Sequence, residues 1–116
     1  MSPKRNDRVA PPSRPGEWEI RYLNTEAARG WEDLCRQAPR STRDAYEVMR
    51  ASPRPPQDSR HHRLRYDLAT RKVGAQELEQ WQIEVTSGGR VWYVIDDRAH
   101  TVWLTLAATG HPKATD

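Results

Sequence analysis

The first half of the chain shows a strand pattern followed by a helical pattern. Apolar and polar residues mix at strand spacing over residues 18–23, which predicts a first strand. Asn24 then offers an N-cap, and apolar residues recur every three or four positions up to Pro39, which predicts an amphipathic helix. The positions on its apolar face are Ala27, Trp31, Leu34, Cys35 and Ala38.

A second, shorter helix is predicted after Pro39. Residues 41–44 have the spacing of a capping box with Asp in place of Glu, and the helix is expected to end at Ser52. Its apolar stripe consists of Ala45, Val48 and Met49. The proline-rich residues 53–60 read as an extended linker, so the two helices form a hairpin followed by a spacer.

The second half of the chain shows strand patterns. Residues 62–66 alternate basic with apolar side chains and predict a strand or a strand-like edge, whereas residues 68–79 are polar, contain Gly74 and predict a loop with at most one helical turn. The three strongest strand segments are residues 81–85, 90–95 and 101–107. Two glycines in the link 86–89 permit a tight hairpin between the first two of these segments.

The order of these elements predicts the fold class and the domain organisation. An N-terminal strand, a helical hairpin and a meander of strands indicate an α+β domain with both helices on one face of an antiparallel sheet. Residues 1–16 contain four prolines and four basic residues, and they predict a disordered or loosely attached basic arm. One domain over residues 17–113 fits the chain length of 116.

The composition narrows the class of protein. The chain has five Trp and no Phe, so indoles supply much of the core, and each buried indole N–H needs an acceptor. A single cysteine, Cys35, excludes an internal disulfide and is interpreted as a small core residue rather than a nucleophile. The longest uncharged apolar run, residues 101–109, is about half a membrane-spanning helix, and the first residues lack the hydrophobic middle of a signal peptide. We therefore expect a cytoplasmic protein without a membrane partner.

Positive charge is concentrated in the middle of the chain. Residues 36–72 contain ten basic and four acidic side chains, a net charge of +6, and nine of the ten are Arg. Residues 17–35 contain two basic and five acidic side chains, and residues 73–116 contain three and six, so each flank has a net charge of −3. Arginine favours phosphate recognition, because its planar guanidinium binds pairs of oxygens and stacks on bases. The alternative is an arginine-rich surface that is merely solvated.

The order of segments in this chain resembles the RelE/ParE toxin superfamily. The similarity lies in Gly89 to Asp97, where a Gly-Arg step opens a strand that ends in acidic residues, and in the Gly110-His111 step after the last strand. The basic segment His62 to Leu68 is also similar to the segment that precedes the meander in that superfamily. The resemblance covers residues 17–113.

The resemblance implies a toxin of a two-gene toxin–antitoxin module. Members of the RelE branch cut mRNA at the ribosome without a metal or another cofactor, so the implied partners are a cognate antitoxin, mRNA and the ribosome. The cleavage is attack of a 2′-hydroxyl on the neighbouring phosphate, which needs a base, a cation at the phosphate and an acid for the leaving oxygen. No metal is expected from the residues either, since no Cys, His or carboxylate cluster has ligand spacing.

The resemblance also assigns candidate site residues. Arg90 matches the arginine that stabilises the phosphate, His111 matches the His or basic position after the last strand, and Glu84 is the candidate general base. The candidate RNA-binding residues are Arg63, Arg65, Trp92 and Lys113. Tyr93 is the alternative to Trp92 as a ring that stacks on a base, and at least one of these two aromatics is expected in the core, since strand neighbours face opposite sides. Arg63 and Arg65 flank one residue at strand spacing, so they are expected to share one face.

Departures from the superfamily pattern leave other functions open. Gln82 and Glu84 stand where RelE-like members carry two basic residues, and the chain has no C-terminal Tyr. Arg90 could instead be structural, bridging at a hairpin end to an acid such as Glu84 or Asp96. The competing functions are a catalytically silent RNA- or protein-binding module on the same fold and a ParE-like inhibitor of gyrase.

Overall fold

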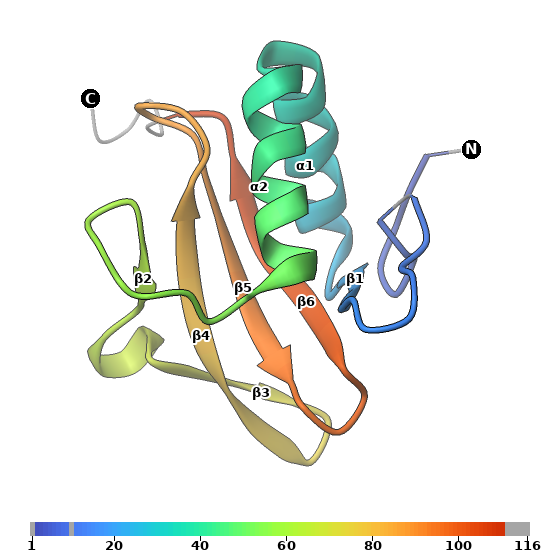
Figure 1. Cartoon of the computed structure of the whole chain (residues 1–116), viewed down its shortest axis with the longest axis vertical. Coiled ribbons are helices and arrows are strands. Elements are labelled where there is room, and N and C mark those ends of the chain that lie inside the picture. Colours follow the sequence, from blue (N-terminus) through green and yellow to red (C-terminus); the bar gives the residue numbers. More distant parts are fainter. Residues whose placement is uncertain (1, 10, 111–116) are drawn as a thin grey trace.

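Two antiparallel helices cover one face of a six-stranded sheet in the computed structural model, which describes residues 2–9 and 11–110 (Figure 1). The strand order is β1-β6-β5-β4-β2, and β3 pairs with β4 outside this path. The helices are α1 (Thr25–Gln37) and α2 (Pro39–Ala51), and a short 3-10 helix, η1, spans Tyr66–Leu68. The strands are β1 (Glu19–Tyr22), β2 (His61–Arg63), β3 (Thr70–Val73), β4 (Gln76–Glu84), β5 (Arg90–Asp96) and β6 (Thr101–Ala108). This confirms the predicted α+β class.

The helical hairpin is as predicted, except at the link between the helices. The Asn24 side chain caps α1 by accepting a hydrogen bond from the backbone N–H of Ala27 at 2.7 Å. Pro39 is the first residue of α2 rather than a spacer, and proline suits this place because the first helical N–H has no partner. The capping box predicted at residues 41–44 is therefore wrong, since these residues lie inside α2. The Thr42 hydroxyl instead donates to the carbonyl of Leu34 at 3.0 Å.

The meander β4-β5-β6 is antiparallel, as predicted, but the sheet as a whole is mixed. β1 pairs with β6 in parallel, with Ile20 opposite Val102. The expectation of an all-antiparallel sheet is therefore wrong at this edge. The chain leaves β1 at the β6 edge of the sheet and crosses one face as the two helices. It then re-enters the sheet at the opposite edge, so β1 lies beside the last strand, β6, rather than beside β4.

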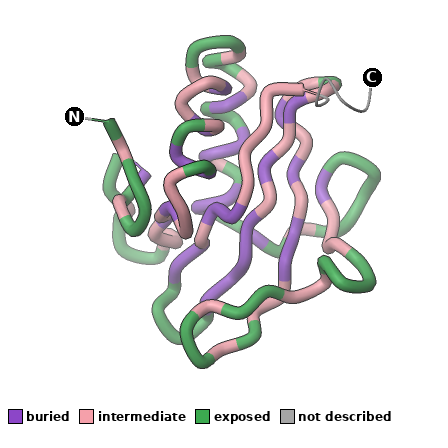
Figure 2. The backbone as a smooth tube through the Cα atoms, turned by 180° about the vertical axis from the view of Figure 1, so that it is seen from behind, coloured by how far each residue is buried: buried purple, intermediate pink, exposed green. Residues whose placement is uncertain are grey.

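The predicted loop over residues 68–79 is instead a β-hairpin. β3 and β4 pair in antiparallel register, and Gly74 turns the chain with a φ of 62°, a conformation that glycine adopts without a steric penalty. η1 and β3 lie on the side of the sheet away from the helices (Figures 1 and 2). The hairpin lacks a hydrophobic alternation because it projects beyond the helix layer, and this is why its sequence resembles a loop.

The N-terminal segment lies along the outer edge of β1. The N–H of Val9 donates to the carbonyl of Ile20 at 2.8 Å, and the N–H of Asn6 donates to the carbonyl of Tyr22 at 2.8 Å. Val9 is only 2% exposed. The structure thus packs part of residues 1–16 on the domain, whereas the sequence favoured a loosely attached arm. This segment covers a strand edge that would otherwise be open to pairing with another chain.

The core lies between the helices and the sheet. α1 approaches β6 closely at Gly30, where a Cβ atom would lie 1.9 Å from the carbonyl oxygen of Ala107. As expected, the indoles of Trp81 and Trp92 find acceptors, whereas Nε1 of Trp103 is buried without a partner among the described residues. Within residues 2–9 and 11–110, no helix is both long and apolar enough to cross a membrane.

Candidate nucleic-acid interface

The two faces of β5 point into different surroundings. Val91, Tyr93 and Ile95 point toward the helices and are at most 1% exposed. Arg90 and Trp92 alternate with them, so they lie on the face that the helices leave uncovered. In the view from behind, this part of the sheet shows half-buried strands with no helix layer in front of them (Figure 2).

η1 and the hairpin that follows it cover the half of this uncovered face that lies toward the C-terminal end of β5. The Gln80 amide donates to the carbonyl of Leu68 at 3.0 Å, and the Thr105 hydroxyl donates to Oε1 of Gln80 at 2.6 Å. Val94, on the same face, is completely buried. The accessible part of the face is therefore the half that lies toward the start of β5. We call this half the open patch. It consists of the half-buried side chains Gln82, Glu84, Arg90, Trp92 and Leu106.

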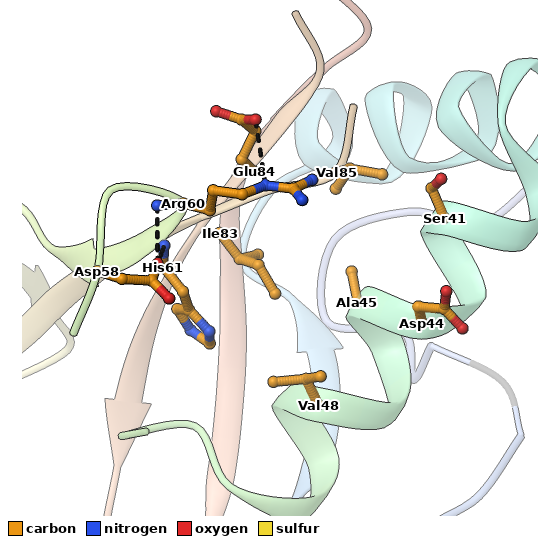
Figure 3. Close-up of a pocket in the computed structure, with 10 residues that line it drawn as sticks. All are labelled: Ser41, Asp44, Ala45, Val48, Asp58, Arg60, His61, Ile83, Glu84 and Val85. Carbon is orange, nitrogen blue, oxygen red and sulfur yellow. Dashed lines mark hydrogen bonds and ion pairs between the residues drawn. The ribbon is translucent and has the colours of Figure 1, made fainter. Parts of the chain in front are cut away.

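Arg90 and Glu84 lie opposite each other in the open patch but are not an ion pair. They are register partners across β4 and β5, yet Oε1 of Glu84 pairs with Nε of Arg60 at 3.3 Å (Figure 3). The guanidinium of Arg90 has no ion-pair or hydrogen-bond partner among the residues that the structure describes. If Arg90 only stabilised the hairpin end, it would form an ion pair with Glu84 or Asp96. It forms neither, and no described residue neutralises its charge.

Trp92 is held at the centre of the open patch by a neighbouring amide. Gln82 is its register partner on β4, and the indole N–H of Trp92 donates to Oε1 of Gln82 at 2.8 Å. Leu106 on β6 lies opposite Trp92 on the other side. Trp92 is thus the half-exposed aromatic of the pair Trp92 and Tyr93, and Tyr93 is the core residue that strand alternation requires.

The two arginines predicted to share one face differ in their partners. β2 ends at Arg63, whose guanidinium pairs with Glu79 at 3.7 Å and donates to the carbonyl of Ala69 at 3.5 Å. Arg65 lies beyond the strand, is exposed and has no ion pair among the described residues. Of these two arginines, only Arg65 keeps its charge free. His111 and Lys113, the other predicted site residues, lie outside the described residues.

Arg63 belongs to a charge network that fastens the 53–60 linker. Arg54 in this linker binds Glu79 on β4 and both oxygens of Asp97, at 2.8 and 3.0 Å. Burial disfavours the charged form of Glu79, but hydrogen bonds from Arg54 and Trp81 nevertheless hold the pKa of Glu79 below its usual value. The hydrogen bond from Arg54 likewise lowers the pKa of Asp97. Arg54 and Arg63 thus form ion pairs within the domain. The sequence alone does not distinguish them from arginines without such partners.

A groove between α2 and β4 is a second feature, and no pattern in the sequence predicts it. Its apolar floor and charged rim are drawn in Figure 3: Ala45, Val48, Ile83 and Val85, with Asp44, Asp58, Arg60 and Glu84 around them. His61 also lines the groove and is bonded through Nε2 to the Tyr93 hydroxyl, which donates to the carbonyl of Pro53 at 2.7 Å. Because that hydroxyl gives its proton to Pro53, Nε2 of His61 is the donor to it. Burial lowers the pKa of His61.

Neither a metal site nor a reactive thiol stands out in the described part of the chain. Residues 2–9 and 11–110 contain no group of three or more His, Cys, Asp or Glu side chains that could hold a metal ion. Cys35 packs against the core, and burial raises the pKa of its thiol, which disfavours the reactive thiolate. Among the described residues, the open patch brings together the guanidinium of Arg90, the indole of Trp92, the amide of Gln82 and the carboxylate of Glu84.

Comparison with protein-family models, with curated proteins and with solved structures found no match to this chain. Any functional conclusion must therefore come from the site itself, and the resemblance to the RelE/ParE superfamily stays a prediction.

Proposed function

We propose that this chain binds single-stranded RNA on its open patch and cleaves it there as a toxin-type endoribonuclease. The observation that carries the proposal is that Arg90, which has no ion-pair or hydrogen-bond partner among the described residues, shares with the half-buried Trp92 the sheet face that the helices leave uncovered. A free arginine attracts a phosphate, and an exposed indole stacks on an unpaired base. These are the two contacts through which proteins hold single-stranded RNA.

The cleavage would use the same patch. A base removes the proton of the 2′-hydroxyl, the 2′-oxygen bonds to phosphorus, and the bond from phosphorus to the 5′-oxygen breaks as an acid protonates that oxygen. Arg90 would stabilise the extra negative charge on the phosphate, Glu84 would act as base, and His111 would act as acid. The products are a 2′,3′-cyclic phosphate and a 5′-hydroxyl. The proposed setting is mRNA on the ribosome in the cytoplasm, with a cognate antitoxin as protein partner.

One observation favours a second candidate, an RNA-binding module without cleavage. The Glu84 carboxylate is engaged by Arg60 at 3.3 Å, so a proton acceptor in the patch is partly committed. For cleavage, Arg60 must release Glu84 or move to the phosphate when RNA binds. Binding needs no such rearrangement.

The decisive experiment compares Arg90→Ala with Arg98→Ala. Arg98 is an exposed arginine in the turn after the far end of β5, so its removal changes the net charge equally without touching the open patch. We expect Arg90→Ala to weaken binding to a labelled single-stranded RNA about tenfold and to slow mRNA cleavage on programmed ribosomes about a hundredfold or more. Arg98→Ala should match the wild type in both assays, and both variants should melt at the wild-type temperature.

The possible outcomes separate the candidates. A folded wild-type protein that binds no RNA contradicts the whole proposal. Binding without new 5′ ends in mRNA selects the silent module, and damaged DNA with intact mRNA selects a gyrase-directed toxin. Growth arrest on overproduction, relieved by an adjacent antitoxin gene, would support the module type.

A further inference from the structure

The orientation of the Gln82 amide is fixed by the chemistry of its neighbour. The indole N–H of Trp92 lies 2.8 Å from Oε1 of Gln82. An indole nitrogen can only donate, so the atom facing it must be the amide oxygen, and the amide cannot turn over without losing this bond. The NH₂ group of Gln82 is therefore directed away from the indole nitrogen.

The amide orientation leaves hydrogen-bond donors on two neighbours of Trp92. The NH₂ group of Gln82 has no acceptor among the described residues, and Gln82 is the register partner of Trp92 on β4. Arg90 lies two residues before Trp92 on β5 and hence on the same face, and its guanidinium has no partner among the described residues. Oε1 of Gln82 accepts the indole N–H, and Oε1 of Glu84 pairs with Arg60.

We propose that Trp92, Gln82 and Arg90 form a subsite for a single base that selects guanine over adenine. This inference rests on the proposed RNA binding. Guanine presents two adjacent acceptors, O6 and N7, which match a surface made of donors, and an arginine fork binds this pair well. Adenine replaces O6 by an amino group, which would meet donors. A glutamine recognises adenine through its oxygen and its NH₂ group together, and here the oxygen already holds the indole.

The test is a binding measurement with uridine oligonucleotides that differ in one central purine. Guanine and adenine have rings of the same size, so both can stack on Trp92 and the ratio of the two affinities reports mainly the difference in hydrogen bonding. We expect the guanine oligonucleotide to bind about tenfold more tightly, because one good bidentate contact typically gives discrimination of this order. Inosine, which keeps O6 and N7, should behave as guanine, and 7-deazaguanine should lose most of the preference.

Two variants test whether the orientation of the Gln82 amide determines the preference for guanine. Trp92→Phe keeps a ring for stacking but removes the N–H, which frees the Gln82 amide to turn. The guanine preference should therefore fall toward one while adenine binding is kept. Gln82→Glu keeps an acceptor for the indole but exchanges the NH₂ donor for an oxygen, so the preference should reverse in favour of adenine.

Gln76→Glu is the matched control for the added charge. Gln76 is the first residue of β4, six residues before Gln82 and so about 20 Å along the strand. This variant should weaken both oligonucleotides equally, if at all, and leave their ratio unchanged. A purely structural role of Gln82 would change melting temperature without changing the ratio.

Three results overturn the inference, and they differ in whether RNA binding itself is refuted. Equal affinities for the two oligonucleotides, or a full guanine preference in Trp92→Phe, refute the base subsite but leave RNA binding intact. Failure of both oligonucleotides to bind the folded wild-type protein refutes the subsite together with the proposed function.

Discussion

Trp92 and Tyr93 are neighbours on β5, yet the sheet gives them opposite tasks. Tyr93 is completely buried against the helices, its hydroxyl donates to the carbonyl of Pro53, and burial raises its pKa. Trp92 is half-exposed on the open patch, where its indole is bonded to the side chain of Gln82. The side chains on the helix-facing side of β5 thus stabilise the core, whereas Arg90 and Trp92 on the other side are partly accessible at the surface. A residue on one side can be changed without directly disturbing the packing on the other.

The arginines show the same contrast. Arg54 and Arg63 are bound to carboxylates that fasten the linker and β4, whereas Arg90 is unpaired among the described residues. A high arginine content therefore does not by itself mark a phosphate site. The informative property is a guanidinium that no carboxylate of its own chain holds.

The largest effect is expected from Tyr93→Ala, which should lower the free energy of unfolding by about 3 to 5 kcal/mol, the usual loss for a buried aromatic side chain. Trp92→Ala should lower it less than Tyr93→Ala does, because Trp92 is only partly buried, and it should also weaken RNA binding. Denaturant unfolding of both variants measures the difference. Equal losses of stability would break the distinction between the two faces.

Arginine substitutions should separate the two kinds of arginine. Arg90→Met should weaken RNA binding about tenfold, equivalent to about 1.4 kcal/mol, and leave the melting temperature unchanged. Arg54→Met should do the reverse, with a loss of stability of at most about 1 kcal/mol because its pairs are partly exposed to solvent. An Arg54 variant with wild-type stability but weakened RNA binding would contradict the assignment.

His61, which is buried on the helix-facing side of the sheet, predicts that the stability of the fold depends on pH. Burial lowers the pKa of His61 in the folded state, so the unfolded chain takes up this proton more readily once the pH falls below about 6.5. The free energy of unfolding should therefore decline as the pH drops through this range, and the histidine should have no effect above it. His61→Gln keeps a donor for the Tyr93 hydroxyl but cannot be protonated. The difference in melting temperature between about pH 7.5 and about pH 5 should be smaller in this variant than in the wild type.

The smallest effect concerns the salt dependence of RNA binding. A phosphate contact to single-stranded nucleic acid contributes about 0.7 to the slope of log affinity against log salt concentration. Arg65→Ala should lower the slope by about this amount, because Arg65 is exposed and unpaired among the described residues. Arg63→Ala should leave it unchanged, because Glu79 already holds this guanidinium. A slope that falls only in Arg63→Ala would reverse the assignment.

Local patterns predicted the elements whose side chains bury one regular face. The spacing of Ala27, Trp31 and Leu34 was sufficient for α1, and the apolar runs were sufficient for β5 and β6. The β3–β4 hairpin was missed because much of its surface is exposed and its sequence is polar. The parallel pairing of β1 with β6 was missed because it joins the two ends of the domain.

The candidate site was predictable in part for similar reasons. Arg90 and Trp92 are two residues apart on one strand, so their common face follows from the sequence. The pairing of Glu84 with Arg60 and of Arg63 with Glu79 does not follow, because long charged side chains choose partners according to the tertiary arrangement. The Gln82 amide was noted only as a departure from a family pattern, although its bond to Trp92 orients the donors of the patch.

The parallel pairing of β1 with β6 has a consequence for synthesis of the chain on the ribosome. β1 is made first, but its partner in the sheet is the last strand to leave the exit tunnel. Until β6 has emerged, Ile20 and Tyr22 lack their partners on β6, and α1 has no β6 backbone to receive Gly30. The domain therefore completes its sheet only after nearly the whole chain has been translated, and a product that ends before residue 101 would expose these apolar side chains to proteases and chaperones.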